Sequence, residues 1–497
     1  MSTFPDYSKY DALGLAGLVK AGEVSPETLL NEAKERLDQV NRRLNAVIHQ
    51  TDSLPHDLIK NLKKTELFCG VPFLVKDLML PFKGMPLSNG SRAMKSWVPT
   101  ENSPMAGRIN ASGLVTFGKT TCSELGASSL TKSAAFGETL NPWDSNKNAG
   151  GSSGGRSVVV ATRVVPMAYS SDGGGSIRLP ASYCGIFGFK PSRGINRYED
   201  MSKAWGGAVV SHVSTISVRD SAAYLDLVAG HTDKDYSISR PSRQSYLFSA
   251  TQENRKLRIG LILQAPTGTP VHPACVKAAE VAARLCENLG HSVEPTHWNF
   301  DGRALMRAFL TIVMNYTHRD VGNIASLLGV VEKQLELEIN TRFLSLTGSG
   351  IGPDKVRQAL EVWQQAAQKM HDLHQRYDVI LTPTVATPPL TGDALDPGAI
   401  EKLLMRLLLR TGLARIIVSD KFLESLIDKS LYQTPFTPIA NMTGQPAMSV
   451  PLHWDENGLP HGAHFMADAE GDRTLFMLAR QLESEQPWAR RVPVKVV

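Results

Sequence analysis

The chain has 497 residues, of which 42% are hydrophobic and 20% are charged, so it can bury the core of one very large α/β domain or of about two to three ordinary ones. Its 53 basic and 48 acidic side chains give a formal net charge of +5. No run of lysines and arginines concentrates this excess, so we expect no nucleic-acid partner. Five cysteines without a CxxC pair favour reduced thiols over a disulfide framework.

The first predicted elements form a helical arm over residues 8–66. Ser25 is a helix N-cap, Pro26 takes the first helical position, and apolar residues from Leu29 to Val40 follow at helical spacing. The beginning of the chain has neither the basic nor the apolar region of a signal peptide. We therefore expect a cytoplasmic protein.

From Gly70 on, short apolar runs bounded by Gly, Pro and Asn predict buried strands. The expected strands are 71–75, 114–117, 257–263, 291–295, 379–382, 447–453 and 464–466, with a helix at 273–289. Strands that alternate with helices over most of the chain predict an α/β fold, in which a mixed twisted sheet is covered by helices on both faces.

The stretch from Leu403 to Val418 comes nearest to a membrane segment, but Arg406, Arg410 and Arg415 recur along it. We expect an amphipathic helix there and no membrane span. The longer helical segment 401–431 carries more leucines than one packing stripe needs: Leu403, Leu404, Leu407, Leu408 and Leu413. It either packs on the sheet or covers the substrate pocket and lines it with aliphatic surface.

The segment 146–181 differs from the rest of the chain, because glycines and serines cluster at residues 150–155 and 173–176. Glycine lets other groups approach the main chain closely, so a serine there is accessible to a substrate. Its hydroxyl can attack a carbonyl carbon, while the N–H groups of Gly173, Gly174, Gly175 and Ser176 converge on the oxyanion that forms. One loop thus offers a nucleophile and an oxyanion hole.

A serine needs a base, and no Ser, His and Asp stand in an arrangement that indicates a triad. Lys76 ends the apolar run 71–75, so its amine is expected to emerge from a buried strand. Burial disfavours the charged form and lowers the pKa of a lysine. Lys76 is therefore a candidate base at neutral pH.

Together these stretches resemble the amidase signature family. The resemblance covers roughly residues 10 to 487 and is strongest at Gly70–Asp77, Gly118–Thr120, Asn141–Trp143, Gly150–Gly155 and Asp172–Ala181, which match in order and spacing. It implies one amidase domain over residues 1–497, with the helical arm at 8–66, an α/β catalytic core at 67–497 and the signature segment at 146–181.

The resemblance also implies a triad in which Lys76 is the base, Ser152 relays the proton beside a cis peptide bond, and Ser176 is the nucleophile. The family serines lie 24 positions apart, which selects Ser152 over Ser153. A main-chain carbonyl near Gly126 would hold the substrate. Asp172 and Arg178 are expected to form a supporting ion pair, and Asp77 is interpreted in the same way. Ser170, Ser171 and Asp172 stand where many relatives have Gly-Ser/Thr-Asp, a departure that concerns local loop shape.

The function implied is hydrolysis of a carboxylic amide through an acyl-enzyme. The tracts 441–451 and 485–489 resemble amidases of small to medium aliphatic amides or lactams. The alternative is an amidotransferase A-type subunit that releases ammonia from glutamine within a larger complex, although the sequence departs from that subunit after residue 194. An inactive scaffold is disfavoured because all triad positions are filled. The expected partner is the small-molecule amide substrate. The sequence leaves open whether the chain forms a homodimer.

Four further sequence patterns match motifs of other functions but lack the neighbouring residues or structure that those motifs require. Residues 113–120 fit a Walker A motif, yet the middle of the motif is an apolar strand. Residues 151–155 fit a nucleophile elbow without the preceding strand, and the S-x-x-K at 129–132 has no K-T-G after it. The H-x-x-H pairs at 371–374 and 461–464 have neither cysteine nor H-E-x-x-H context, so we expect no metal and no cofactor.

Overall fold

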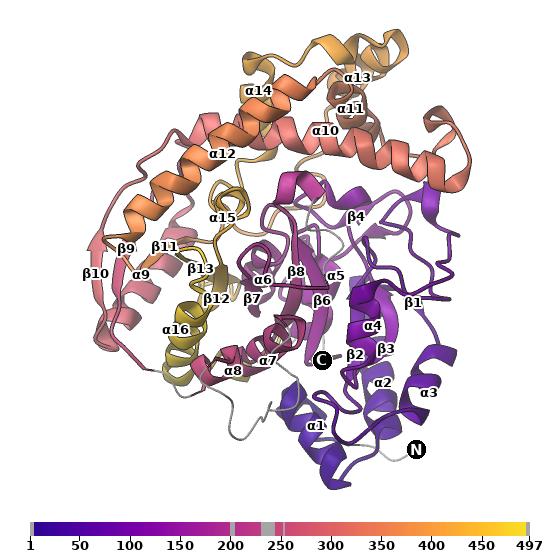
Figure 1. Cartoon of the computed structure of the whole chain (residues 1–497), viewed down its shortest axis with the longest axis vertical. Coiled ribbons are helices and arrows are strands. Elements are labelled where there is room, and N and C mark those ends of the chain that lie inside the picture. The colour runs from indigo at the N-terminus through magenta and orange to yellow at the C-terminus, as the bar shows by residue number, and fades with distance from the viewer. Residues whose placement is uncertain (1–3, 199–203, 230–243, 252–253, 494–497) are drawn as a thin grey trace.

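The computed structural model describes residues 4–198, 204–229, 244–251 and 254–493. Its centre is an 11-stranded sheet (Figure 1). From edge to edge the strands are β1 (Val47–Gln50), β3 (Val115–Thr120), β2 (Pro72–Lys76), β6 (Met167–Asp172), β8 (Val210–Thr215), β7 (Phe187–Lys190), β12 (Ala447–Trp454), β13 (Pro460–Ala467), β11 (Val379–Pro383), β9 (Arg258–Leu261) and β10 (Ser292–Pro295). A separate pair, β4 (Lys132–Ser133) and β5 (Gly137–Glu138), forms a small hairpin.

The sheet is mixed, as the alternation of strands and helices predicted. β3, β2 and β6 are parallel neighbours, and so are β11, β9 and β10. The strands between these two groups pair antiparallel. Parallel strands need covering on both faces, and helices supply it. The expected class, one large α/β domain with a helix-covered mixed sheet, is confirmed.

The helices fall into those that pack on the sheet and those that form an outer layer beside it (Figure 1). The first set includes α5 (Gly154–Ala161), α6 (Arg178–Cys184), α7 (Val218–Ala229), α9 (Pro273–Asn288) and α16 (Asp472–Glu485). The outer layer is built from α10 (Gly302–Leu328), α11 (Ile339–Gly348), α12 (Pro353–His374), α13 (Ala399–Thr411) and α14 (Asp420–Ser430). The remaining helices are α1 (Ala12–Ala21), α2 (Pro26–Leu44), α3 (Ser53–Lys60), α4 (Pro104–Asn110), α8 (Tyr246–Ser249) and α15 (Thr437–Thr443).

The N-terminal arm follows its local signals but also joins the sheet. α2 begins at Pro26, and the Ser25 hydroxyl accepts a hydrogen bond from the Thr28 N–H, as the N-cap pattern predicted. Within the same arm, β1 pairs antiparallel with β3. The arm is therefore not purely helical, because its short strand β1 forms one edge of the sheet. Local helix signals in the sequence do not reveal this strand.

Several local expectations can be compared directly with the structure. Residues 115–120 form β3, a fully buried strand, so the Walker-like pattern is not a phosphate loop. The predicted strands 257–263 and 291–295 and the predicted helix 273–289 between them are confirmed as β9, β10 and α9. Within the described residues, no helix is both long and apolar enough to cross a membrane. Part of the tract in which the sequence departs from amidotransferase subunits, residues 199–203, lies outside the described residues.

The segment 401–431 is helical, as predicted, and comprises α13, a short 3-10 turn at Leu413–Ile416 and α14. Neither expected placement is met within the described residues, because α13 packs on the helix α11 rather than on the sheet and its exposed leucines enclose no pocket. Leu403, Leu404, Leu407 and Leu413 are between 49% and 68% exposed. They face solvent because α13 packs on the outer helix α11 through its other side, where Met405 is buried against Phe343.

Candidate active site

The candidate site lies where the parallel strands β2 and β6 end side by side. Lys76 is the last residue of β2, and Asp172 is the last residue of β6. The chain then turns through Gly173–Ser176 into α6, while the loop with Ser152 leads into α5. Parallel strand ends meet at one edge of a sheet, so the fold brings together residues that are far apart in sequence.

Lys76, Ser152 and Ser176 form a continuous chain of polar contacts. The Lys76 Nζ lies 2.9 Å from the Ser152 Oγ, which lies 3.0 Å from the Ser176 Oγ. The Ser152 N–H also donates to the Ser176 Oγ at 3.1 Å, and the peptide bond between Gly151 and Ser152 is cis. Lys76 and Ser152 are buried, whereas Ser176 is partly exposed. The arrangement leaves the Ser176 hydroxyl accessible and buries the Lys76 amine behind it.

Burial lowers the pKa of Lys76 to about 7. The nearby Cys122 and Asp172 favour the charged amine, whereas the positive charge of Arg156 disfavours it. A second contact joins the Lys76 Nζ to the Ser171 Oγ at 3.4 Å. A pKa this far below the usual value leaves a substantial share of the amine neutral near pH 7, and the neutral amine is the form that a general base requires.

Asp172 and Arg178 form the predicted ion pair, and both side chains are fully buried. The Arg178 Nη2 lies 2.9 Å from the Asp172 Oδ1, and its Nε lies 3.0 Å from the Oδ2. Burial raises the pKa of Asp172, but Arg178 and Asn441 outweigh this effect and hold the pKa below its usual value. The carboxylate also accepts from the N–H groups of Gly175 and Ile177, so it fixes the shape of the nucleophile loop.

Asp77 likewise has a supporting role. It accepts hydrogen bonds from the N–H and the hydroxyl of Ser88, and the Lys119 Nζ lies 3.7 Å away. Both ionic side chains are buried. These contacts brace the turn that follows Lys76 and confirm the interpretation of Asp77 as an ion-pair partner.

Arg156 is a site residue that the sequence reasoning missed. It lies on α5 with no exposed surface, and its Nη2 donates to the main-chain carbonyls of Ser176 at 3.0 Å and Ile177 at 2.9 Å. Burial lowers its pKa to about 9. An arginine directly between a glycine-rich loop and an apolar Val-Val-Val run was the available signal, since a charge placed there must be buried.

The glycines of the nucleophile loop are packed so closely that side chains would not fit. A Cβ on Gly174 would lie 2.8 Å from the Phe309 ring, and one on Gly175, whose φ is +122°, would lie 2.2 Å from the Thr437 Oγ1. The Gly175 N–H already donates to Asp172 at 2.6 Å. Of the four N–H groups predicted for the oxyanion hole, those of Gly173, Gly174 and Ser176 are the better candidates.

Gly126, which the resemblance named as a substrate-binding position, lies close to Ser152. It ends a short 3-10 turn with φ of +69°, and a Cβ at this position would lie 3.4 Å from the Ser152 Oγ. Gly126 is partly exposed, like Ser176. The structure therefore brings this predicted substrate-binding position to the same edge as Lys76, Ser152 and Ser176.

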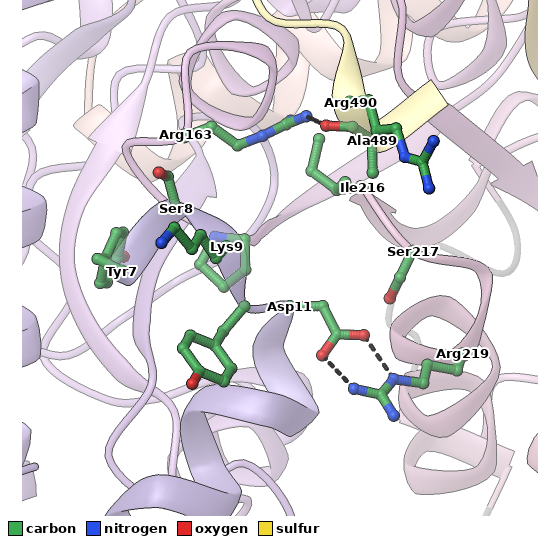
Figure 2. Close-up of a pocket in the computed structure, with 12 residues that line it drawn as sticks. Tyr7, Ser8, Lys9, Asp11, Arg163, Ile216, Ser217, Arg219, Ala489 and Arg490 are labelled. Carbon is green, nitrogen blue, oxygen red and sulfur yellow. Dashed lines mark hydrogen bonds and ion pairs between the residues drawn. The ribbon is translucent and has the colours of Figure 1, made fainter. Parts of the chain in front are cut away.

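A pocket of about 470 Å³ lies elsewhere, between the N-terminal arm and the C-terminal stretch (Figure 2). It contacts Pro166, just before the start of β6, whereas the candidate site lies at the other end of that strand. Asp11 and Arg219 pair across it, and Arg163 donates to the Ala489 carbonyl at 2.8 Å. None of the predicted site residues lines this pocket.

Comparisons with known proteins show the family to which the chain belongs. The model of the amidase family matches residues 28–476. The 6-aminohexanoate-cyclic-dimer hydrolase of Pseudomonas sp. (strain NK87) is 30% identical over 97% of this chain and 96% of its own. The lipoamidase of Enterococcus faecalis is 30% identical over 96% of this chain and 64% of its own.

Among solved structures, a 6-aminohexanoate cyclic dimer hydrolase complexed with its substrate superposes with a TM-score of 0.87 at 27% identity, covering 99% of this chain and 100% of that one. The likeness extends over the whole sheet and both helical layers, and the sequence match spans the strand ends at which the polar contacts lie. The chain belongs to the amidase signature family and is a hydrolase of amide bonds.

Proposed function

We propose that the chain hydrolyses a carboxylic amide through an acyl-enzyme on Ser176, with Ser152 as proton relay and Lys76 as base. The observation that carries this proposal is the unbroken contact chain from the Lys76 Nζ to the Ser152 Oγ and on to the Ser176 Oγ, with steps of 2.9 and 3.0 Å. A pKa of about 7 at the buried end of the chain supports it.

In the acylation step, the neutral Lys76 amine takes the proton of the Ser152 hydroxyl, which takes the proton of Ser176. The Ser176 Oγ bonds to the amide carbon, and the carbonyl oxygen becomes an oxyanion close to the loop N–H groups. The proton then returns through Ser152 to the amide nitrogen. The C–N bond breaks, the amine leaves in neutral form, and the acyl group stays on Ser176.

Deacylation follows the same path with water in place of Ser176. A water molecule gives its proton through Ser152 to Lys76 as its oxygen bonds to the acyl carbon. Collapse of the oxyanion breaks the ester bond, the Ser176 oxygen regains the proton, and the carboxylic acid is released. Arg156 and Asp172 hold the nucleophile loop through its main chain during both steps.

The substrate class we propose is small to medium aliphatic amides or lactams. The likeness to a hydrolase whose name specifies a cyclic dimer of 6-aminohexanoate supports an uncharged aliphatic substrate. Release of ammonia from glutamine within a larger complex is the alternative. A cytoplasmic location, a homodimer and the absence of a nucleic-acid partner stay predictions from the sequence.

The test uses the purified full chain with hexanamide, glutamine and a fluorophosphonate label. Ser176→Ala should lose both hydrolysis and labelling, because the acyl-enzyme needs that Oγ. Ser153→Ala is the matched control, since its buried Oγ makes no hydrogen bond within the described structure. Labelling of Ser153, or near-normal turnover by Ser176→Ala, would refute the assignment. Faster turnover of glutamine than of hexanamide would favour the amidotransferase alternative.

A further inference from the structure

An unusual share of exposed apolar surface lies on one short segment. Of the eleven most exposed large apolar side chains in the described part of the chain, six lie between residues 400 and 416. They are Ile400 at 86%, Leu403 at 68%, Leu404 at 53%, Leu407 at 57%, Leu413 at 49% and Ile416 at 78%. Scattered single leucines on a surface are ordinary, but a contiguous group indicates an interaction site.

The group forms one face of α13 and continues into the 3-10 turn after it. Residues 400, 403, 404 and 407 follow the spacing of one helix face, so their side chains lie together. Another side of the helix packs on α11 and buries Met405. α13 is thus apolar on two sides, and Figure 1 shows it at the outer edge of the molecule, above α11.

Positive charges flank this apolar face. Lys402, Arg406 and Arg410 recur every four residues along one side of it, and Arg415 lies on the following turn. In the part of the chain that the structure describes, none of the three arginines has an ion-pair partner. The nearby Glu401 is paired with Lys429 at 3.2 Å. The surface is therefore apolar in the centre and cationic at the side.

We propose that the α13 surface, defined by the six exposed apolar residues and the flanking arginines, binds peripherally to an anionic lipid surface. A helix with this distribution lies in the plane of the interface, with its apolar side chains at the acyl boundary and its cations among the headgroups. Anionic headgroups supply the negative charge that the arginines do not find among the described residues. The binding does not depend on the proposed catalytic triad.

A second copy of the chain fits the same surface less well. A two-fold dimer contact joins identical patches, so it would bury two arginine-flanked faces against each other and would offer the arginines no free carboxylate, since Glu401 is already paired with Lys429. Like charges brought together at an interface disfavour association. The charge pattern therefore favours a negatively charged lipid surface over self-association.

The experiment measures sedimentation of the full chain with phosphatidylcholine vesicles that contain either no phosphatidylglycerol or roughly one third of it. We expect binding to the anionic vesicles that weakens as salt is added. Leu403→Gln/Leu404→Gln/Leu407→Gln should lower the partition coefficient at least about tenfold. Arg406→Gln/Arg410→Gln/Arg415→Gln should reduce binding to the level seen without phosphatidylglycerol.

Leu327→Gln/Val331→Gln is the matched control, because these exposed apolar residues lie outside the α13 surface and should leave binding unchanged. Wild-type chain that stays in the supernatant, or an equal loss in the control, would overturn the proposal. Light scattering distinguishes the other occupant: a wild-type dimer that the leucine variant converts to monomer, without vesicle binding, would assign the surface to a second copy. Equal melting temperatures of the variants exclude unfolding as the cause.

Discussion

The nucleophile loop and α13 are opposite in how they place charge and apolar surface. Around the loop, Lys76, Asp172, Arg178 and Arg156 are charged residue types with no exposed surface. On α13, leucines that would ordinarily be buried are more than half exposed. Both placements oppose the usual distribution, in which charges face water and large apolar groups do not.

The difference lies in how each unfavourable placement is compensated. Asp172 and Arg178 compensate each other inside the molecule as a buried ion pair. Arg156 is held through its Nη2, which donates to two main-chain carbonyls, while its Nε and Nη1 make no hydrogen bond within the described residues. Within the described residues, nothing covers the exposed face of α13. Charges that are paired inside the fold indicate a preorganised reaction centre. Apolar side chains that no other part of the fold covers indicate a surface that binds another molecule.

The largest expected effect comes from removing the buried amine. Lys76→Met should lower kcat/KM for hexanamide on the order of 10⁴-fold at pH 8, because no other group accepts the proton from Ser152. The fold should survive, since methionine fills a similar apolar volume. Lys132→Met, which alters a lysine paired with Asp396 away from the triad, is the control. More than a tenth of wild-type activity in Lys76→Met would contradict its role as base.

The second-largest effect should be a loss of stability when the buried ion pair of Asp172 and Arg178 is broken. Arg178→Met leaves the Asp172 carboxylate buried without its partner, and the free energy of unfolding should fall by about 3–5 kcal/mol. Urea denaturation followed by circular dichroism measures the change. Arg357→Met is the comparison, because its partners Asp354 and Glu361 are largely exposed and the loss should stay below about 1 kcal/mol. Equal losses in both variants would mean that burial does not set the strength of the pair.

A smaller effect concerns the pH profile. In the wild type, kcat/KM should fall about tenfold per pH unit below pH 7 and level off above it, since only the neutral Lys76 is a base. Arg156→Met removes a positive charge that lowers the pKa of Lys76, so that pKa rises and the midpoint moves to higher pH. Arg156→Lys keeps the charge and should stay nearer the wild-type midpoint. An unchanged midpoint in Arg156→Met would limit Arg156 to holding the loop.

The smallest expected effect tests the outer region. Leu407→Asp should change kcat/KM for soluble hexanamide by less than about twofold, because surface positions that touch neither substrate nor core tolerate substitution. The same substitution should weaken vesicle binding. A large loss of activity on soluble aliphatic amides, or a changed preference along a series of chain lengths, would mean that α13 reaches the substrate after all.

Local signals predicted much of this fold. The start of α2 at Pro26, the helix α9 and the strands β9, β10, β12 and β13 follow from caps, periodicity and bounding residues, which act over a few positions. β1 was not predicted, because a four-residue strand at a sheet edge depends on its partner β3 rather than on its own sequence.

The sequence by itself determined which chemical groups are available. Through the motif spacing, it also identified Lys76, Ser152 and Ser176 as the candidate catalytic residues. It also determined the class of fold. The motifs and the secondary-structure pattern both depend on residue types at short and regular intervals. Tertiary structure alone decided that Arg156 contacts the Ser176 carbonyl, that Gly126 lies beside Ser152, and that Leu403, Leu404 and Leu407 of α13 face outward. The physical reason is that burial and contact depend on which elements pack together. A helix with two apolar sides does not reveal from its own residues which side the rest of the chain will cover.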